Sequence, residues 1–208
     1  MTDQGVKLVR VWAMVALAAA LWVVAFALPW SNFWLKIAGS ASLLALLSVW
    51  IAPPAAGWRR PDGRDLIRGI VSAMALWLIF WAGKAVSSQL FAFADGQIGA
   101  IYGKGTGMSR WGIFVLLLTV TGPAEEIFWR GFLQKQLMGR FGNARGWALA
   151  TAAYALVHVC SMNFMLVGAA AVAGAFWGLL YWHWGRLWPV IISHALWSAF
   201  IFAVVPIP

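Results

Sequence analysis

Two adjacent glutamates, Glu125 and Glu126, are the residues of this sequence best suited to chemistry. They are the only glutamates among 208 residues, they follow an apolar run at 111–120, and Arg130 comes four residues after Glu126. An ionisable side chain at membrane depth costs roughly 2.5–3.5 kcal/mol, so such a residue indicates a functional site by default.

Helical spacing predicts different roles for the two glutamates. Residues four apart share a helix face, so Glu126 and Arg130 are expected to form an ion pair. Glu125 is rotated by about 100° from Glu126 and is left available. Pro123, just upstream, predicts a kink or a restart of the helix. The alternative is that both glutamates form an ion-pair cluster at the membrane edge with Arg130 and Lys135.

Two histidines lie inside apolar runs, where a polar side chain needs a partner. Tyr154 precedes His158 by four residues, and Ser198 follows His194 by four, so each pair shares a face. The rise of a helix is about 1.5 Å per residue. If the helix that carries Glu125 ends shortly after Arg130, then Glu125, His158, His194 and Ser198 are expected to share one level. That level lies in the cytoplasmic half of the bilayer.

Two chemistries suit a cluster of Glu125, His158 and His194. In the first, Glu125 is a general base on a water that one histidine orients, and the second histidine with a hydroxyl such as that of Ser198 stabilises the oxyanion. In the second, Glu125, His158 and His194 bind zinc. The sequence has no HExxH motif, which favours hydrolysis without a cofactor.

The composition indicates an all-α, polytopic membrane protein. Hydrophobic residues make up 63% of the chain, charged residues only 10%, and the mean hydropathy is +0.81. The apolar runs are continuous and too long for a membrane β-barrel. The net charge of +9 lies in short loops, so it indicates membrane topology rather than nucleic-acid binding. One cysteine excludes an internal disulfide.

About seven transmembrane helices, within a range of six to eight, are expected in one membrane domain that covers residues 1–208. The apolar runs lie at 11–28, 33–52 (closed by Pro53-Pro54), 70–91, from 111 through the glutamates, 146–160, 164–182 and 189–205. Residues 11–91 form N-terminal accessory helices, and residues 111–205 form the catalytic core. Residues 95–107 are expected to be the longest external loop.

Basic residues predict the orientation, because short cytoplasmic loops are enriched in Lys and Arg. One set of helix ends carries Lys7, Arg10, Arg59, Arg60, Arg64, Arg68, Lys135, Arg140, Arg145 and Arg186. The other carries only Lys36, Lys84, Lys104 and Arg110. The N-terminus is therefore placed in the cytoplasm and the C-terminus outside. The short loops and small size favour a bacterial inner-membrane protein.

A stripe of small residues, Ala170, Gly174 and Gly178, includes a GxxxG motif and allows close approach of helices. It is compatible with packing inside one chain or with a homodimer through the face of Gly174 and Gly178.

Several motifs together resemble a known family. They are Glu125-Glu126-x-x-x-Arg130 followed by Gly-Phe-Leu, then Tyr154-x-x-x-His158, and Gly-Arg-Leu-Trp-Pro-Val-Ile-Ile-Ser before His194. Over roughly residues 121–200 the chain resembles the CPBP intramembrane proteases, also called the CAAX-protease and bacteriocin-processing, or Abi, family. The family usually has Phe where this chain has Tyr154, and Asn or Asp where it has Ser198.

The resemblance implies a glutamate-dependent intramembrane peptidase. Glu125 is then the catalytic base, His158 helps to activate the water, His194 contributes to the oxyanion site, and Glu126 with Arg130 is a structural pair. The expected partners are the lipid bilayer and a membrane-associated peptide or protein, such as a prenylated tail, a bacteriocin leader or a C-terminal sorting signal. The alternatives are a non-catalytic scaffold or regulator, favoured by Ser198, and a proton-coupled carrier, which the lack of an internal repeat disfavours.

Overall fold

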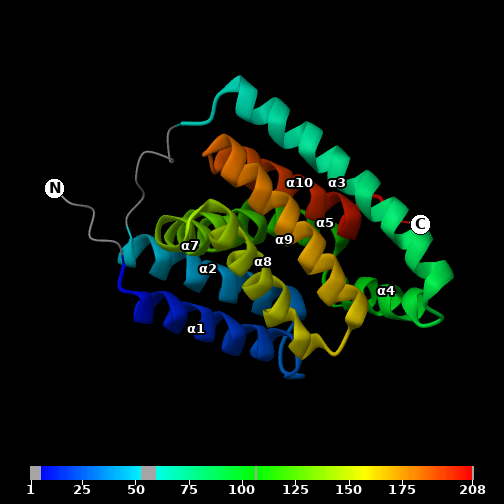
Figure 1. Ribbon diagram of the computed structural model, residues 1–208. Helices are drawn as coiled ribbons and strands as arrows, with labels where there is room; N and C mark the ends of the chain where they lie inside the picture. The colour runs from blue at the N-terminus through cyan, green and yellow to red at the C-terminus, as the bar shows by residue number, and fades with distance from the viewer. Residues whose placement is uncertain (1–5, 53–59, 106, 208) are drawn as a thin grey trace.

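The computed structural model describes residues 6–52, 60–105 and 107–207, and all regular structure in these ranges is helical (Figure 1). The predicted end of the second span at Pro53-Pro54 lies outside the described residues. The α-helices are α1 (Leu8–Phe26), α2 (Phe33–Ile51), α3 (Gly63–Leu90), α4 (Ala94–Tyr102), α5 (Arg110–Leu116), α6 (Gly122–Glu126), α7 (Lys135–Phe141), α8 (Asn143–Val157), α9 (Phe164–Trp184) and α10 (Trp188–Ala203).

The helices make the chain a multi-pass membrane protein. Among the described residues, five helical stretches are long and apolar enough to cross a membrane: α1, α2, α3, the continuous run Arg110–Phe141 and α9. The helix α10 is apolar but shorter, and α8 has 15 residues. Each apolar run predicted from the sequence therefore coincides with a helix or with a helical run.

The third span begins seven residues before its predicted start at residue 70, because Asp62 caps it. The Asp62 side chain accepts a hydrogen bond from the Asp65 backbone N–H at 2.9 Å. In return, the Asp65 carboxylate accepts one from the Asp62 backbone N–H at 3.1 Å. Such a reciprocal capping box satisfies N–H groups at a helix start. The Arg186 guanidinium also donates to the buried Asp65 carboxylate, which ties α3 to the turn between α9 and α10.

The run Arg110–Phe141 is one helical rod with two π-helical segments, η3 (Leu117–Thr121) and η4 (Ile127–Gln134). The helix neither restarts nor breaks at Pro123, because the π-helical turn before it accommodates a residue without a backbone N–H. Glu125 and Glu126 therefore lie on the short α-helical segment between two π segments, an irregularity that is frequent at functional sites.

The predicted external loop at residues 95–107 is wrong over most of its length. It contains α4 and the short 3-10 turn η2 (Gly103–Gly105). Gln97 of α4 holds the start of α9, because its backbone carbonyl accepts from Asn163 Nδ2 at 2.8 Å and its side chain accepts from the Met165 N–H at 3.0 Å. Five glycines in this segment obscured its helical character in the sequence.

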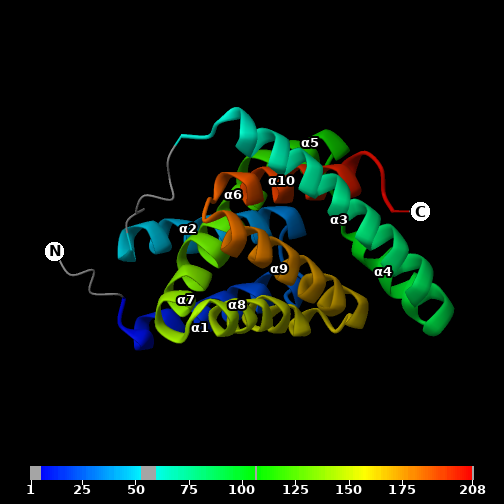
Figure 2. The ribbon, with the colours of Figure 1, turned by 45° about the horizontal axis from the view of Figure 1, so that its top comes forward.

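The helix ends gather in two groups (Figures 1 and 2). The starts of α1 and α3, the α7–α8 turn and the α9–α10 turn lie on the left of Figure 1. We call this the basic end, after its described residues Lys7, Arg10, Arg60, Arg64, Arg68, Lys135, Arg140, Arg145 and Arg186. The α1–α2 turn, α4, the α8–α9 turn and the C-terminus lie on the right, which we call the opposite end.

The small-residue stripe of α9 packs inside the chain. A Cβ at Gly174 would lie 2.9 Å from Cδ1 of Tyr154, and one at Gly178 would lie 2.8 Å from Cδ1 of Trp147. Ala170, Gly174 and Gly178 are all buried. The structure therefore favours packing inside the chain, the first of the two expectations for this stripe, because helix α8 covers that face. The homodimer through the Gly174 and Gly178 face has no support.

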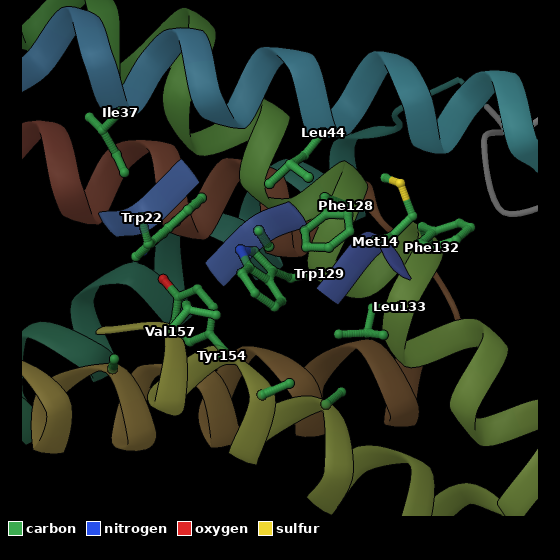
Figure 3. Packing of buried hydrophobic residues seen from close by; sticks show 14 of the residues in the cluster. Met14, Trp22, Ile37, Leu44, Phe128, Trp129, Phe132, Leu133, Tyr154 and Val157 are labelled. Carbon is green, nitrogen blue, oxygen red and sulfur yellow. The ribbon is translucent and has the colours of Figure 1, made fainter. Parts of the chain in front are cut away.

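An aromatic core lies where α1 packs against the helical run that carries the glutamates (Figure 3). Trp22, Phe128, Trp129, Phe132 and Leu133 are each at most 2% exposed. The rings of Trp22 and Trp129 meet edge to face at 5.9 Å, a favoured geometry for aromatic pairs. This packing joins α1 to the helix that carries the glutamates.

Candidate active site

Glu126 is the acceptor in a buried network that joins three helices. Its Oε1 accepts from Arg130 Nη1 at 2.8 Å, the contact expected from their spacing, and from His194 Nδ1 of α10 at 2.6 Å. Arg130 Nη2 also donates to the Gly174 carbonyl of α9 at 3.1 Å. The Arg130 guanidinium lies over the rings of Tyr154 and Trp177, which adds cation–π attraction.

Glu125 points away from this network, as its rotation along the helix predicts. Its Oε2 accepts from the Tyr154 hydroxyl at 3.1 Å, and among the described residues its Oε1 has no hydrogen bond. The side chain is only 7% exposed and lines a cavity. One carboxylate oxygen is thus held in position, and the other is available to a bound water or substrate.

His158 uses both ring nitrogens. Its Nε2 accepts from the Trp22 indole N–H at 3.1 Å, because the indole N–H is only a donor. Its Nδ1 therefore carries the proton and donates to the Tyr154 carbonyl at 2.7 Å. No pattern in the sequence points to Trp22, which is 136 residues away and resembles the many tryptophans of membrane interfaces.

His194 presents one ring nitrogen to the cavity. Because Glu126 is a carboxylate paired with Arg130, His194 Nδ1 donates to it, and neutral His194 has its lone pair on Nε2. Among the described residues, Nε2 has no hydrogen bond. The ring stacks on Trp177 with centroids 3.9 Å apart, and the Trp177 indole N–H donates to Ser193 Oγ at 3.1 Å. Trp177 is a positioning residue that the sequence analysis missed.

Ser198 borders the cavity, but its hydroxyl is directed to its own helix. Its Oγ donates to the His194 carbonyl at 2.7 Å. Serine hydroxyls in helices commonly bond back to the preceding turn in this way. In this arrangement Ser198 supplies no donor to the centre of the site, which differs from the role expected for it in oxyanion stabilisation.

These residues surround a cavity of about 420 Å³. Glu125, His194 and Trp177 meet at its inner end together with Tyr154 and His158. The rest of its wall is mainly apolar, which suits a hydrophobic ligand. Other lining residues include Phe26, Phe33, Trp34, Ile37, Ile79, Phe80, Lys84, Ser87, Phe91, Ile98, Tyr102, Lys104, Phe164, Trp197, Ile201 and Phe202.

The premise of the depth estimate made from the sequence is wrong. That estimate assumed that the helix ends shortly after Arg130, but the helix continues to Phe141. Glu125 therefore lies about 24 Å along the helix from Phe141, near the middle of the run that starts at Arg110. His158 follows the last residue of α8, at the helix end remote from the α7–α8 turn.

The donor set is unfavourable for a zinc ion. Within residues 6–52, 60–105 and 107–207, no group of three His, Cys, Asp or Glu side chains is placed to hold a metal ion. His158 is unsuited to bind a metal ion in this arrangement, because its Nε2 lone pair accepts from Trp22 and its Nδ1 donates to a carbonyl.

Comparison with protein families identifies the part of the chain that carries this site. Residues 107–200 match the family described as Type II CAAX prenyl endopeptidase Rce1-like. Over these residues the chain is similar to an Rce1-like type II CAAX prenyl endopeptidase domain, in agreement with the resemblance to the CPBP intramembrane proteases. Searches of curated proteins and of solved structures gave no match.

The matched range contains all the predicted site residues, from Glu125 to Ser198, and leaves Trp22 of α1 outside. The family supports an intramembrane endopeptidase of the CAAX type in general.

Proposed function

We propose that the protein is a glutamate-dependent intramembrane endopeptidase that cleaves near the C-terminus or the membrane-proximal end of a peptide or lipidated protein. The observation that carries this proposal is the position of Glu125 at the inner end of a largely apolar cavity, with one oxygen fixed by Tyr154 and His194 close by. A carboxylate held in this way suits a general base on water.

In this mechanism Glu125 takes a proton from a water, and the water oxygen attacks the scissile carbonyl carbon. The carbonyl π electrons move to its oxygen, the C–N bond then breaks, and the proton passes to the leaving amine. His158 contributes through Nε2 when the Trp22 N–H releases it. His194 accepts or returns a proton at Nε2, and its protonated form donates to the oxyanion.

The network around Glu126 supports these roles. The Glu126 carboxylate fixes the His194 tautomer and stabilises the ring when it is protonated, as carboxylates do for catalytic histidines elsewhere. Arg130 holds the Glu126 carboxylate in place through its guanidinium. Glu126 and Arg130 therefore act as positioning residues, and Ser198 contributes to the wall of the cavity.

We further propose that the hydrolysis needs no metal ion, and that the protein resides in the cytoplasmic membrane of a bacterium with its basic end in the cytoplasm. The hydrogen bonds of His158 support the first point. The concentration of Lys and Arg at one end supports the orientation.

A second candidate function is a non-catalytic scaffold or regulator that keeps the protease fold. The Ser198 hydroxyl favours it, because its proton is committed to the His194 carbonyl.

The variant Glu125→Gln separates the two functions. It is expected to abolish peptide cleavage in membranes while the protein stays folded, because an amide cannot take the proton from water. Tyr154→Phe is the matched control, since it removes only the hydrogen bond to Glu125 and should reduce the rate without abolishing it. Normal processing by a folded Glu125→Gln protein would exclude the glutamate-base mechanism.

A further inference from the structure

The cavity extends from the site in one direction only. Four helices contribute to its wall mainly from the half nearer the opposite end: Phe26 from α1, Phe33–Ile37 from α2, Ile79–Ser87 from α3 and His194–Phe202 from α10. The helix α4 and the start of α9 complete this wall. No described lysine or arginine of the basic end lines the cavity.

Tightly packed side chains close the other direction. Phe128, Trp129, Leu133 and Leu137 are each at most 1% exposed, and they follow Glu125 along the helical run toward its end at Phe141, next to the basic end. Figure 3 shows Phe128, Trp129 and Leu133 in the packed core. Gln134 seals the same region, because its Nε2 donates to the Gly178 carbonyl at 2.8 Å. Protein interiors packed in this way leave no passage for a peptide.

The two ends carry unequal charge. Most described lysines and arginines lie at the basic end, whereas the opposite end carries Lys36, Lys84, Lys104 and Arg110. Short cytoplasmic segments are enriched in such residues, so the basic end faces the cytoplasm. The cavity therefore extends toward the extracytoplasmic side.

We propose that substrates reach Glu125 from the extracytoplasmic side of the membrane, so that the enzyme acts on peptides or lipidated segments that already lie outside the cytoplasm. The cavity suits such a ligand, since aromatic rings line it and the Lys84 and Lys104 ammonium groups border it. The substrate class rests on the proposed peptidase function, whereas the side of access does not.

Thiol labelling in intact bacterial cells tests the side of access directly. The only cysteine, Cys160, is replaced by Ala, and single cysteines are introduced by Lys84→Cys at the cavity and Arg64→Cys at the basic end. A charged, membrane-impermeant maleimide should label Lys84→Cys in intact cells and Arg64→Cys only after permeabilisation. Ile98→Cys, on α4, repeats the measurement where Lys84→Cys fails to accumulate. The reverse labelling pattern would overturn the proposal.

A second measurement separates the side of access from the chemistry. Two single-span reporters carry the same test peptide at the C-terminus, one placed outside the cell and one in the cytoplasm. Cleavage of the external reporter alone supports the proposal, and cleavage of the cytoplasmic reporter contradicts it. External labelling with neither reporter cleaved would retain external access and reject the extracytoplasmic peptide as substrate.

Discussion

At the residue scale, the two neighbouring glutamates differ in what surrounds them. Glu126 accepts from a guanidinium and an imidazole and is fully buried, whereas Glu125 accepts only from a tyrosine hydroxyl and borders a cavity. Their separation follows from helix geometry alone, because adjacent residues point about 100° apart. One short sequence thus provides both a structural carboxylate and an available one.

Removing the charge of Glu126 should damage stability and activity together. Glu126→Gln leaves Arg130 buried without its carboxylate, which is expected to lower the free energy of unfolding by about 3–5 kcal/mol. It also weakens the acceptor that orients His194, so cleavage should fall. Thermal unfolding in detergent and peptide cleavage measure the two effects.

The matched control is Asp95→Asn, which neutralises a carboxylate whose side chain is 69% exposed. Its unfolding temperature should stay near that of the parent protein, because exposed ion pairs contribute little. Equal stability and activity of Glu126→Gln and the parent would contradict the assigned role.

Trp22→Phe tests how His158 acts. The substitution removes the N–H that occupies Nε2 of His158 and keeps an aromatic ring in the core. We expect a stability loss of about 1 kcal/mol from the missing hydrogen bond. Cleavage should stay at or above the parent level, because Nε2 becomes available to water. Trp12→Phe, at an exposed position of α1, controls for general effects. Loss of cleavage by a folded Trp22→Phe protein would show that His158 acts only while Trp22 holds it.

At the element scale, the site depends on a close approach between the glutamate helix and α10. Gly122 permits this approach, since a Cβ there would lie 2.8 Å from the Ala195 Cα and 3.0 Å from its backbone nitrogen. The atoms in contact belong to the backbone, so no side-chain rotation relieves the clash. The contact between Glu126 and His194 crosses the same helix interface.

Gly122→Ala should therefore separate the two helices. Overpacking of this kind costs about 1–3 kcal/mol of stability, and the shift should lengthen the Glu126–His194 contact and reduce cleavage. Gly39→Ala is the matched control, because a Cβ at that helical position has open space around it. Thermal unfolding and cleavage of both variants provide the comparison. An active, equally stable Gly122→Ala protein would show that the interface tolerates the methyl group.

The same scale shows what the sequence predicts well and where it fails. The Glu126–Arg130 contact is local, so spacing along one helix was enough to predict it. The continuation of the helix to Phe141 was missed, because the segment after Arg130 is polar and glycine-containing and resembles a loop. Because the helix is longer than predicted, Glu125 lies farther from its end at Phe141 than the sequence suggested. The residues around Glu125 were nevertheless predicted.

At the scale of the whole molecule, the missed features are contacts between segments far apart in the chain. Trp22 approaches His158 across 136 residues, and Trp177 stacks on His194 from another helix. No periodicity in the sequence encodes such a pairing, and the many tryptophans of this chain make any one of them inconspicuous. The lengths of the apolar runs predicted the membrane helices. The direction in which the cavity extends depends on packing between helices, which the sequence does not predict.

The hydrogen bonds of the assembled site also predict its response to metal removal. Both ring nitrogens of His158 and Nδ1 of His194 are engaged with protein groups. Among the described His, Cys, Asp and Glu side chains that line the cavity, this leaves only His194 Nε2 and the Glu125 carboxylate as available donors. Zinc sites in enzymes typically use three protein ligands, so two donors are too few to hold the ion firmly. Cleavage by the purified protein should therefore persist after exhaustive dialysis against a strong chelator. The control is the same treatment of a known zinc protease, which must lose activity. The contrary outcome is that cleavage is lost on dialysis and restored by added zinc. It would show that Trp22 releases His158 to a metal ion, and that a metal-assisted mechanism replaces the glutamate-base mechanism.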